Sequence, residues 1–386
     1  MPNPIFANLP TTIFEVMSSL SRELGAINLG QGFPDEPGPL AIREAAARAC
    51  IDGPNQYPSM LGLPELRQAV AGHYNRTQGL DLDWAREVTV TSGATEALAA
   101  AFLGLIEPGD EVVVIQPVYD AYLPMIRRAG GVPKLISLTP PHWRLTREAL
   151  ESVFSERTRI VALNIPLNPA AVTFAEEDLA LLAEFCVRYD TVAVCDEVWE
   201  QVVFSPHKHR PLIGFPGMRE RCVKIGSAGK MFALTGWKIG FLCAAPALTQ
   251  VLAKTHQFLT FTTPPNLQAA IAFGLDNSAD WFARMPLDLA RSRDRLTAGL
   301  TAEGFKVLES QGTYFLNIDL PASGIAEDDA SFCMRAIKEH GVASIPVSSF
   351  YEQGAVTSIV RVCFPKADAT LDAGIERLAK ARAAAV

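Results

Sequence analysis

The segment EVTVTSGATEALAAAFLGLIEPGDEVVVIQ, residues 87–116, places a helical run between two short β-branched runs. The first run (87–91) and the last (111–116) have the length and composition of buried strands. Between them, ATEALAAAFLGLI has apolar residues at a spacing near 3.6, which predicts a helix. This order of strand, helix and strand is the repeating unit of a parallel sheet.

The same alternation continues along the chain. Four further runs have the character of strands: RIVALN (159–164), TVAVCD (191–196), CVKIGS (222–227) and IGFLCA (239–244). Helical spacing recurs in LPELRQAVAGHYN and EEDLALLAEFCVRY. The sequence therefore predicts an α/β fold in which helices cover both faces of a mostly parallel sheet.

The pattern changes after about residue 278. A long charged helix, the run GTYFLNIDL, a second helix, the strand IVRVCF and a terminal helix predict a smaller α+β domain. The first 40 or so residues are rich in Pro and Gly, contain no long periodic run, and are expected to pack against that domain. We therefore expect a large domain at 45–278 and a small domain formed by 1–44 and 279–386.

Bulk composition excludes several classes of protein. The 386 residues are 49% hydrophobic and 20% charged, as in a globular enzyme, and the net charge of -8 disfavours nucleic acid or anionic membranes as partners. The seven cysteines lack zinc-ligand spacing, so no metal site is expected. No secretory signal is visible, and the longest apolar run (97–106) is about half a membrane span. These features predict a cytoplasmic protein.

Distinctive motifs follow five of the predicted strands: SGATEA, PVYDAY, IPLNP, DEVWE and SAGK. Open α/β sheets bind ligands at the carboxyl ends of their strands, so these motifs are expected to meet at one crevice. Their combined chemistry fits a ligand with a phosphate, an aromatic ring and a carbonyl.

The phosphate is expected where SGAT (92–95) begins a helix, because free backbone N–H groups and the helix dipole attract an anion. Ser227 and Lys238 add a hydroxyl and a cation. Taken alone, Ser92 or Thr95 would be read as an ordinary helix cap.

Lys230 lies in a glycine-flanked stretch between two buried strands, where a lysine is costly unless its pKa falls. A neutral amine there could attack an aldehyde and later move a proton. Asp196 ends another buried strand and could pair with a pyridinium nitrogen, while Tyr119 could lie against the ring. The alternatives are a surface lysine, a helix cap and a tyrosine at the edge of the core.

With these residues in place, the sequence resembles the fold-type I aminotransferases that use pyridoxal 5'-phosphate (PLP), and among them kynurenine and methionine aminotransferases. The resemblance implies a seven-stranded sheet in the large domain, a homodimer with shared active sites, and a ping-pong reaction of an amino acid with a 2-oxo acid. The motifs that carry it are TTIFEVMSSL, AINLGQGFPDEPGP, NQYPSMLGLPELR, TSGATEAL, PVYDAY, NIPLNP, CDEVWE, SAGKMFALTGWKIG, GTYF and IVRVCF.

The resemblance also implies residue roles. Lys230 would carry PLP as a Schiff base and move the proton, Asp196 would pair with the pyridine nitrogen, Asn168 would bond the ring O3', and Tyr119 would stack on the ring. Arg361 would hold the substrate carboxylate, helped by the backbone of Gly32. The phosphate would be held by Gly93, Ala94, Thr95, Ser227 and Lys238, with Tyr57 reaching it from the second subunit.

The sequence departs from the family pattern at three places. Trp199 stands where most relatives have a tyrosine on O3', and an indole N–H can donate one hydrogen bond but cannot ionise. Ala170 and Ala171 replace Thr-Gly after the retained Asn168. Lys238 replaces an arginine, which keeps the charge and loses the planar fork.

The substrate is less constrained. Phe14, Phe33 and Phe261 could line an apolar pocket or be plain core, and no second basic residue marks a dicarboxylic substrate. Neutral apolar or aromatic amino acids are favoured: methionine, phenylalanine, glutamine or kynurenine. Some relatives have histidine at Thr262, which weighs against assuming kynurenine.

Two other functions use the same cofactor. A cysteine-S-conjugate β-lyase could use the same site. A PLP-sensing regulatory domain is disfavoured because the chain has no room for a DNA-binding module and no basic face.

A nucleotide-binding Rossmann enzyme is excluded because no G-x-G-x-x-G follows the first strand.

Overall fold

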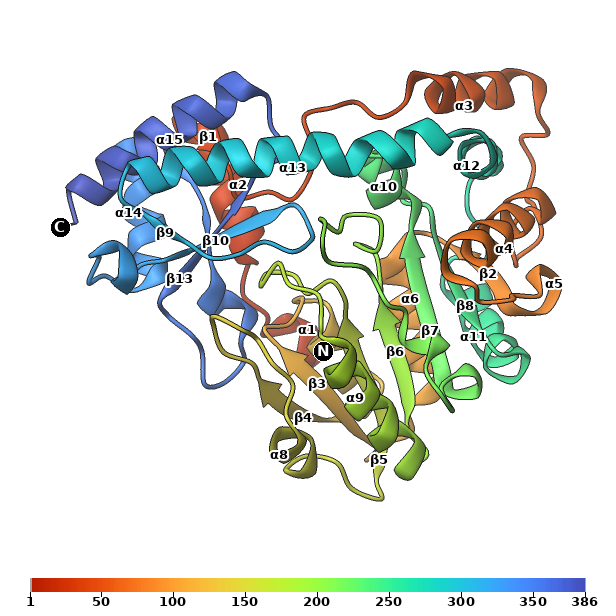
Figure 1. Cartoon of the computed structure of the whole chain (residues 1–386). Helices are drawn as coiled ribbons and strands as arrows, with labels where there is room; N and C mark the ends of the chain where they lie inside the picture. Colours follow the sequence, from red (N-terminus) through yellow and green to blue (C-terminus); the bar gives the residue numbers. More distant parts are fainter. Residues whose placement is uncertain (1, 386) are drawn as a thin grey trace.

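A central seven-stranded sheet organises the protein, whose computed structural model describes residues 2–385 (Figure 1). All neighbouring strands are parallel except β8, which runs antiparallel to both β2 and β7. The expected seven-stranded, mostly parallel sheet is therefore confirmed. In spatial order its strands are β2 (Val88–Thr91), β8 (Gly240–Ala244), β7 (Cys222–Ser227), β6 (Val192–Asp196), β5 (Thr158–Asn164), β3 (Glu111–Gln116) and β4 (Val132–Ser137).

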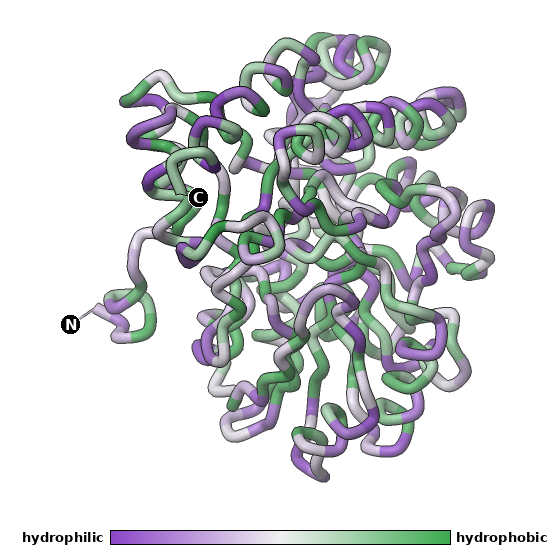
Figure 2. Tube along the Cα trace, turned by 60° about the vertical axis from the view of Figure 1, so that its left-hand side comes forward, coloured by the Kyte–Doolittle hydropathy of each residue, from purple (hydrophilic) through white to green (hydrophobic). Residues whose placement is uncertain are grey.

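Both faces of this sheet are buried under helices. Alternate side chains of β3 enter different hydrophobic clusters, Val112 and Val114 on one face and Val113 and Ile115 on the other. The first face packs against α6 (Ala94–Leu105), α7 (Tyr122–Arg128) and α11 (Pro246–Leu259), and the second against α4 (Pro64–Gln78) and α9 (Glu176–Arg188). Apolar residues are concentrated along the strands between these layers (Figure 2).

A smaller sheet of four strands lies at the other end of the long helix α13 (Ala279–Ala302) (Figure 1). The start of α13 is bonded to the segment that follows β7 of the large sheet, because the Trp281 indole N–H donates to the Met231 carbonyl at 2.8 Å. Farther along, α13 contacts α15 (Asp368–Ala383). The small sheet contains β12 (Ile345–Pro346), β13 (Ile359–Cys363), β10 (Phe315–Asp319) and β9 (Lys306–Val307).

The N-terminal segment contains a helix that we did not expect. The helix α2 (Ile13–Leu24) is capped by Thr12, whose hydroxyl accepts from the Glu15 N–H, and it ends at Gly25 in the left-handed region. The expectation of no long periodic run here is wrong, because Ile13, Val16, Met17 and Leu20 do follow helical spacing. The helix contacts α14 (Asp329–His340), and β1 (Ile27–Asn28) pairs in parallel with β11 (Val342–Ala343). The domain bounds given above stay a prediction.

Strand β4 was also missed. It is an edge strand that pairs only with β3, it contains Pro133, and only Ile136 of its six residues is buried, so it lacks the apolar run of a central strand. None of the helices within residues 2–385 is long and apolar enough to cross a membrane. The remaining α-helices of the described residues are α1 (Pro4–Ala7), α3 (Leu40–Asp52), α5 (Trp84–Glu87), α8 (Arg147–Glu151), α10 (Ala228–Met231) and α12 (Pro265–Asn277).

Candidate active site

A cavity of about 230 Å³ opens at the carboxyl ends of the parallel strands. It is built from the segments that follow β2, β3, β5, β6 and β7, as the motif positions predicted. Ten of the predicted site residues share it. The lining residues are Gly93, Ala94, Thr95, Leu98, Tyr119, Asn164, Asn168, Asp196, Val198, Trp199, Ser227, Lys230, Thr235 and Lys238.

One end of the cavity is formed by the turn at which helix α6 begins. Helix α6 begins at Ala94, and no side chain caps it, so its first N–H groups are free for a ligand. Gly93 precedes it with φ +76°, and a Cβ there would lie 3.2 Å from Lys238 Cε. The backbone and the lysine therefore approach each other closely only because residue 93 is glycine.

Lys230 is one of the residues that line the cavity. Its Nζ donates to the Gly32 carbonyl at 3.2 Å and is 4.5 Å from the centroid of the Trp199 ring. Burial lowers the pKa of Lys230 to about 8, although Asp196 opposes that change. A substantial fraction of this amine is therefore neutral near physiological pH and able to act as a nucleophile.

Gly32 leaves room for this contact. A Cβ at position 32 would lie 2.6 Å from Phe315 Cζ, so a larger residue would push the segment away from Lys230. Tyr314, which was not predicted, holds the backbone of the lysine, because its hydroxyl donates to the Lys230 carbonyl at 3.2 Å.

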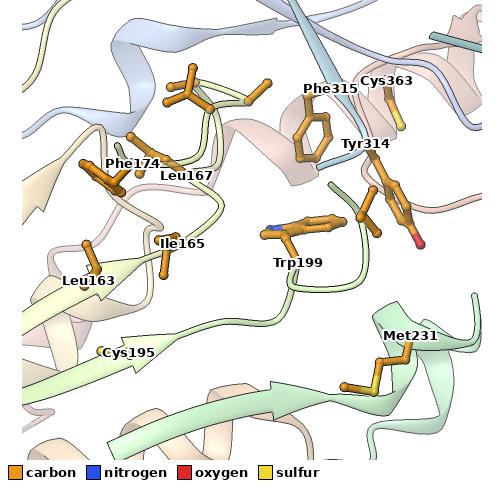
Figure 3. Packing of buried hydrophobic residues seen from close by; sticks show 14 of the residues in the cluster. Leu163, Ile165, Leu167, Phe174, Cys195, Trp199, Met231, Tyr314, Phe315 and Cys363 are labelled. Atoms are coloured by element: carbon orange, nitrogen blue, oxygen red, sulfur yellow. The ribbon is translucent and has the colours of Figure 1, made fainter. Parts of the chain in front are cut away.

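Trp199 forms an aromatic wall beside the lysine. Its ring meets Tyr314 and Phe315 edge-on, with centroids 4.7 and 5.5 Å away (Figure 3). The indole nitrogen is at the end of the ring remote from Tyr314 (Figure 3). The hydrogen bond predicted for this N–H stays a prediction.

Asp196 faces the cavity from the end of β6 and is 5% exposed. Burial raises the pKa of Asp196 to about 6, while the hydroxyl of Tyr122, donating to Oδ2 at 2.6 Å, opposes the rise. Tyr122, the second tyrosine of PVYDAY, was not predicted. Its position three residues after Tyr119 at the start of a helix could have suggested a partner for a buried carboxylate.

Replacing Tyr122 with phenylalanine is expected to raise the pKa of Asp196 beyond about 6. Because a hydrogen bond to a charged group contributes about 1.5–3 kcal/mol, the increase should be on the order of one unit. Titrating the carboxylate by infrared spectroscopy in the ligand-free protein measures it. An unchanged or lower pKa would show that the Tyr122 bond does not stabilise the carboxylate.

A chain of hydrogen bonds joins Asp196 to Arg361. Asn164 donates to the Asp196 carbonyl at 3.0 Å and accepts from the Asn168 N–H at 2.7 Å. The Asn168 side-chain oxygen then accepts from Arg361 Nη1 at 2.8 Å, and Arg361 Nη2 donates to the Gly30 carbonyl at 2.7 Å. Asn164, like Tyr314 and Tyr122, was not predicted from the sequence.

Arg361 is a buried cation without an anionic partner. Arg361 is 1% exposed, and its Nε has no hydrogen-bond acceptor. None of the ion pairs formed by residues 2–385 includes Arg361. Its guanidinium lies 3.8 Å from the Phe315 ring centroid, and burial lowers the pKa of Arg361 to about 9. An unpaired buried charge is costly, so this group is suited to receive a carboxylate ligand.

Four predicted residues lie elsewhere. Tyr57 is 83% exposed and packs edge-on against Phe261 at 5.7 Å, outside the cavity. Phe33 lies beneath Lys366, whose Nζ is 4.4 Å from the ring centroid. Phe14 is nearer the site, since the Arg361 guanidinium is 5.4 Å from its ring.

This geometry fits a phosphorylated aromatic aldehyde. The α6 turn and Lys238 suit a phosphate, Asp196 suits a protonated ring nitrogen, and the lysine amine suits an aldehyde. The free Arg361 remains for a carboxylate on a second ligand.

Comparison with known proteins agrees with this chemistry. The family model for aminotransferase class I and II matches residues 25–378. The chain is 43% identical to a probable N-succinyldiaminopimelate aminotransferase of Mycobacterium tuberculosis (95% of each chain) and 40% identical to a methionine aminotransferase of Escherichia coli (98% of each). It is 36% identical to human kynurenine–oxoglutarate transaminase 1, over 94% of this chain and 93% of that one.

The fold agrees as well. A solved structure of the N-succinyldiaminopimelate aminotransferase from M. tuberculosis superposes with a TM-score of 0.95 at 42% identity, covering 99% of this chain and 100% of that one. The chain therefore belongs to the class I and II aminotransferases, and it is a transaminase that uses pyridoxal phosphate.

Proposed function

We propose that this enzyme moves the amino group of a neutral apolar or aromatic amino acid to a 2-oxo acid by a ping-pong mechanism. The preferred donors belong to the methionine, phenylalanine, glutamine and kynurenine class. The observation that carries the proposal is that Arg361 has no anionic partner, lies near Lys230, and packs against Phe14 and Phe350 of an apolar groove.

When bound, pyridoxal phosphate supplies an aldehyde and a ring that accepts the electron pair of a deprotonated Cα. Lys230 would hold the aldehyde carbon, and its amine, once displaced by substrate, would take the Cα proton and return it at C4'. Asp196 would keep the ring nitrogen protonated. Residues that would hold the rest of the cofactor are Gly93, Ala94, Thr95, Ser227 and Lys238 at the phosphate and Tyr119, Asn168 and Trp199 at the ring.

Arg361 would bind the α-carboxylate shared by amino and oxo acids. Asn168 and Gly30 already hold two of its nitrogens, so the guanidinium is oriented before substrate arrives. Gly32 would bring its backbone to the same carboxylate. The Lys230 amine bonded to the Gly32 carbonyl would then lie near the Cα that follows this carboxylate.

The substrate side chain would enter a groove of about 720 Å³ between the N-terminal segment and α7. This groove meets the cofactor cavity at Thr95, and Phe6, Leu9, Phe14 and Phe350 line it. Asp120 is the one charged residue among its lining. A side chain that ends in carboxylates would find no lysine or arginine there, whereas an apolar one would be buried.

We also propose that the active enzyme is a cytoplasmic homodimer. The seven cysteines are all free, which supports a reducing compartment. Tyr57 and Phe258 are 83% and 85% exposed, and large exposed aromatic residues favour a face covered by a second copy. Tyr57 of one subunit would then reach the phosphate bound in the other.

A panel of amino acids tested against several 2-oxo acids checks the substrate class. We expect kcat/KM for methionine or phenylalanine to exceed that for aspartate or N-succinyldiaminopimelate by about tenfold or more, as expected when a charged group has no partner in an apolar site. A preference for an acidic donor would contradict the proposal. Release of pyruvate and thiol from cysteine S-conjugates without an oxo acid would instead identify a β-lyase.

A further inference from the structure

Glu96 and His256 form a buried pair between α6 and α11. The Glu96 side chain leaves the first turn of α6, and Oε1 is 2.6 Å from His256 Nδ1. His256 is 0% exposed and Glu96 is 8% exposed. The two groups are close to the cofactor cavity, yet neither lines it.

The geometry specifies a charged imidazole. The second ring nitrogen, Nε2, is 2.8 Å from the Met60 carbonyl, which can only accept a hydrogen bond. When Glu96 is ionised, Nδ1 also faces a group that can only accept, so both nitrogens donate and both are protonated. In accord with this, Glu96 raises the pKa of His256 even though burial opposes the charge.

The pair connects two segments that are far apart in the sequence, the turn before α6 and the loop that contains Tyr57. Glu96 Oε2 accepts from the Ser92 N–H at 2.7 Å and so fixes the turn in which Gly93 and Ala94 present their backbone. His256 Nε2 bonds the carbonyl of Met60, which lies three residues after Tyr57. The His256 carbonyl also accepts from the Phe261 N–H at 3.3 Å, and Phe261 packs against the Tyr57 ring.

We propose that Glu96 and His256 are positioning residues for the cofactor phosphate, and that they hold the α6 turn and the Tyr57 loop (55–62) in a fixed relation. Neither touches the phosphate. Glu96 acts through the α6 turn, which receives the phosphate within the same subunit. His256 acts through Tyr57, which would reach the phosphate in the partner subunit. This inference rests on the phosphate assignment proposed above.

The test compares two ligands of the apoenzyme, PLP and pyridoxal, which lacks the phosphate. Glu96→Gln removes the charge and keeps the shape. We expect it to raise the Kd of PLP by about tenfold, the scale of one charge-assisted hydrogen bond, and to leave the Kd of pyridoxal within about twofold. Absorbance titration measures both.

His256 variants separate the two halves of the pair. In His256→Asn the amide can replace Nδ1 and keep the Glu96 contact, whereas in His256→Gln it can replace Nε2 and keep the Met60 contact. Each should lose part of the PLP affinity. The loss in His256→Asn should vanish in a Tyr57→Phe background, because both changes act on the same loop.

Glu87→Gln is the matched control. Glu87 is also buried, accepts from a backbone N–H, that of Asp83, and pairs with Arg219, but it is remote from the phosphate turn. Its loss should lower stability without changing the affinity for PLP. Equal weakening of PLP and pyridoxal in Glu96→Gln would reduce the pair to a structural role and overturn the inference.

Ser227→Ala separates failure of the inference from failure of the phosphate assignment. If Ser227→Ala weakens PLP and the Glu96 and His256 variants do not, the inference alone is wrong. If none of them affects PLP, the phosphate site itself is misplaced. Should Glu96→Gln fail to fold, His256→Gln gives the same comparison of the two ligands.

Discussion

Lys230→Ala is expected to reduce the turnover number by a factor on the order of 10⁴ and to abolish the visible absorption band of the lysine-bound cofactor. The amine is both the group that would hold the aldehyde carbon and the base that would move the Cα proton. No other lysine lies close enough to replace it, because Lys238 is the only other one lining the described cavity and is directed at Gly93.

The pH dependence gives an independent measure of the same group. Because burial lowers the pKa of Lys230 to about 8, the neutral amine becomes the major form as pH rises through that value. The rate at which apoenzyme captures PLP should therefore increase between about pH 7 and 9 and then level off. Stopped-flow absorbance follows this rate directly.

Lys254→Ala is the matched control for both measurements. Lys254 is an exposed residue of α11, so its removal should leave the band, the capture rate and turnover unchanged. Retention of the visible band and of transamination in Lys230→Ala would place the cofactor linkage elsewhere. A capture rate that is flat across this pH range would show that the amine is not titrating as its burial implies.

The sheet was largely predictable because its central strands are buried on both faces. Runs such as RIVALN and TVAVCD are short, rich in apolar residues and lack a polar face, which is typical of strands in a covered sheet. The direction of β8 was not predictable from its composition, since an antiparallel strand in this position is just as apolar. Strand β8 runs antiparallel to β7 because the connection between them is short and contains no full crossover helix. This connection carries Lys230 and Lys238.

The site was predictable where a motif follows a strand. Residues such as Asp196, Asn168 and Lys230 meet because the parallel strands that carry them end at one edge. Tyr122, Asn164 and Tyr314 were missed because their contribution is to orient those residues, which depends on distances between side chains. The role proposed for Tyr57 involves a second subunit, so one chain's sequence indicates it only through the family resemblance.

A second buried network supports the turn that carries Asp196 and Trp199. Lys224 Nζ lies 2.5 Å from Glu197 Oε2 and 2.6 Å from Glu200 Oε2, and all three side chains are 0% exposed. Burial disfavours the ammonium, but the two carboxylates raise the pKa of Lys224. Together with His209, the glutamates have the spacing of a metal-ligand set, and Lys224 supplies the positive charge between them.

Lys224→Met is expected to lower the free energy of unfolding by about 3–5 kcal/mol, the cost of leaving buried charges without their partner. Methionine fills a similar volume, so little of this loss would come from a cavity. Because Glu197 directly follows Asp196 and Glu200 directly follows Trp199, the affinity for PLP should fall as well. Urea denaturation of the apoenzyme measures the stability, and Lys254→Met provides the exposed control.

The loss of stability in Lys224→Met should grow as pH rises. Without Lys224 the buried carboxylates take up protons, so their pKa in the folded variant rises above the value in the unfolded chain. The variant is then least impaired at low pH and loses stability as pH rises through that raised pKa. Adding Glu200→Gln to Lys224→Met should recover part of the loss at neutral pH. If the single variant is as stable as the wild type at pH 8, or grows more stable as pH rises, the ammonium does not hold these carboxylates.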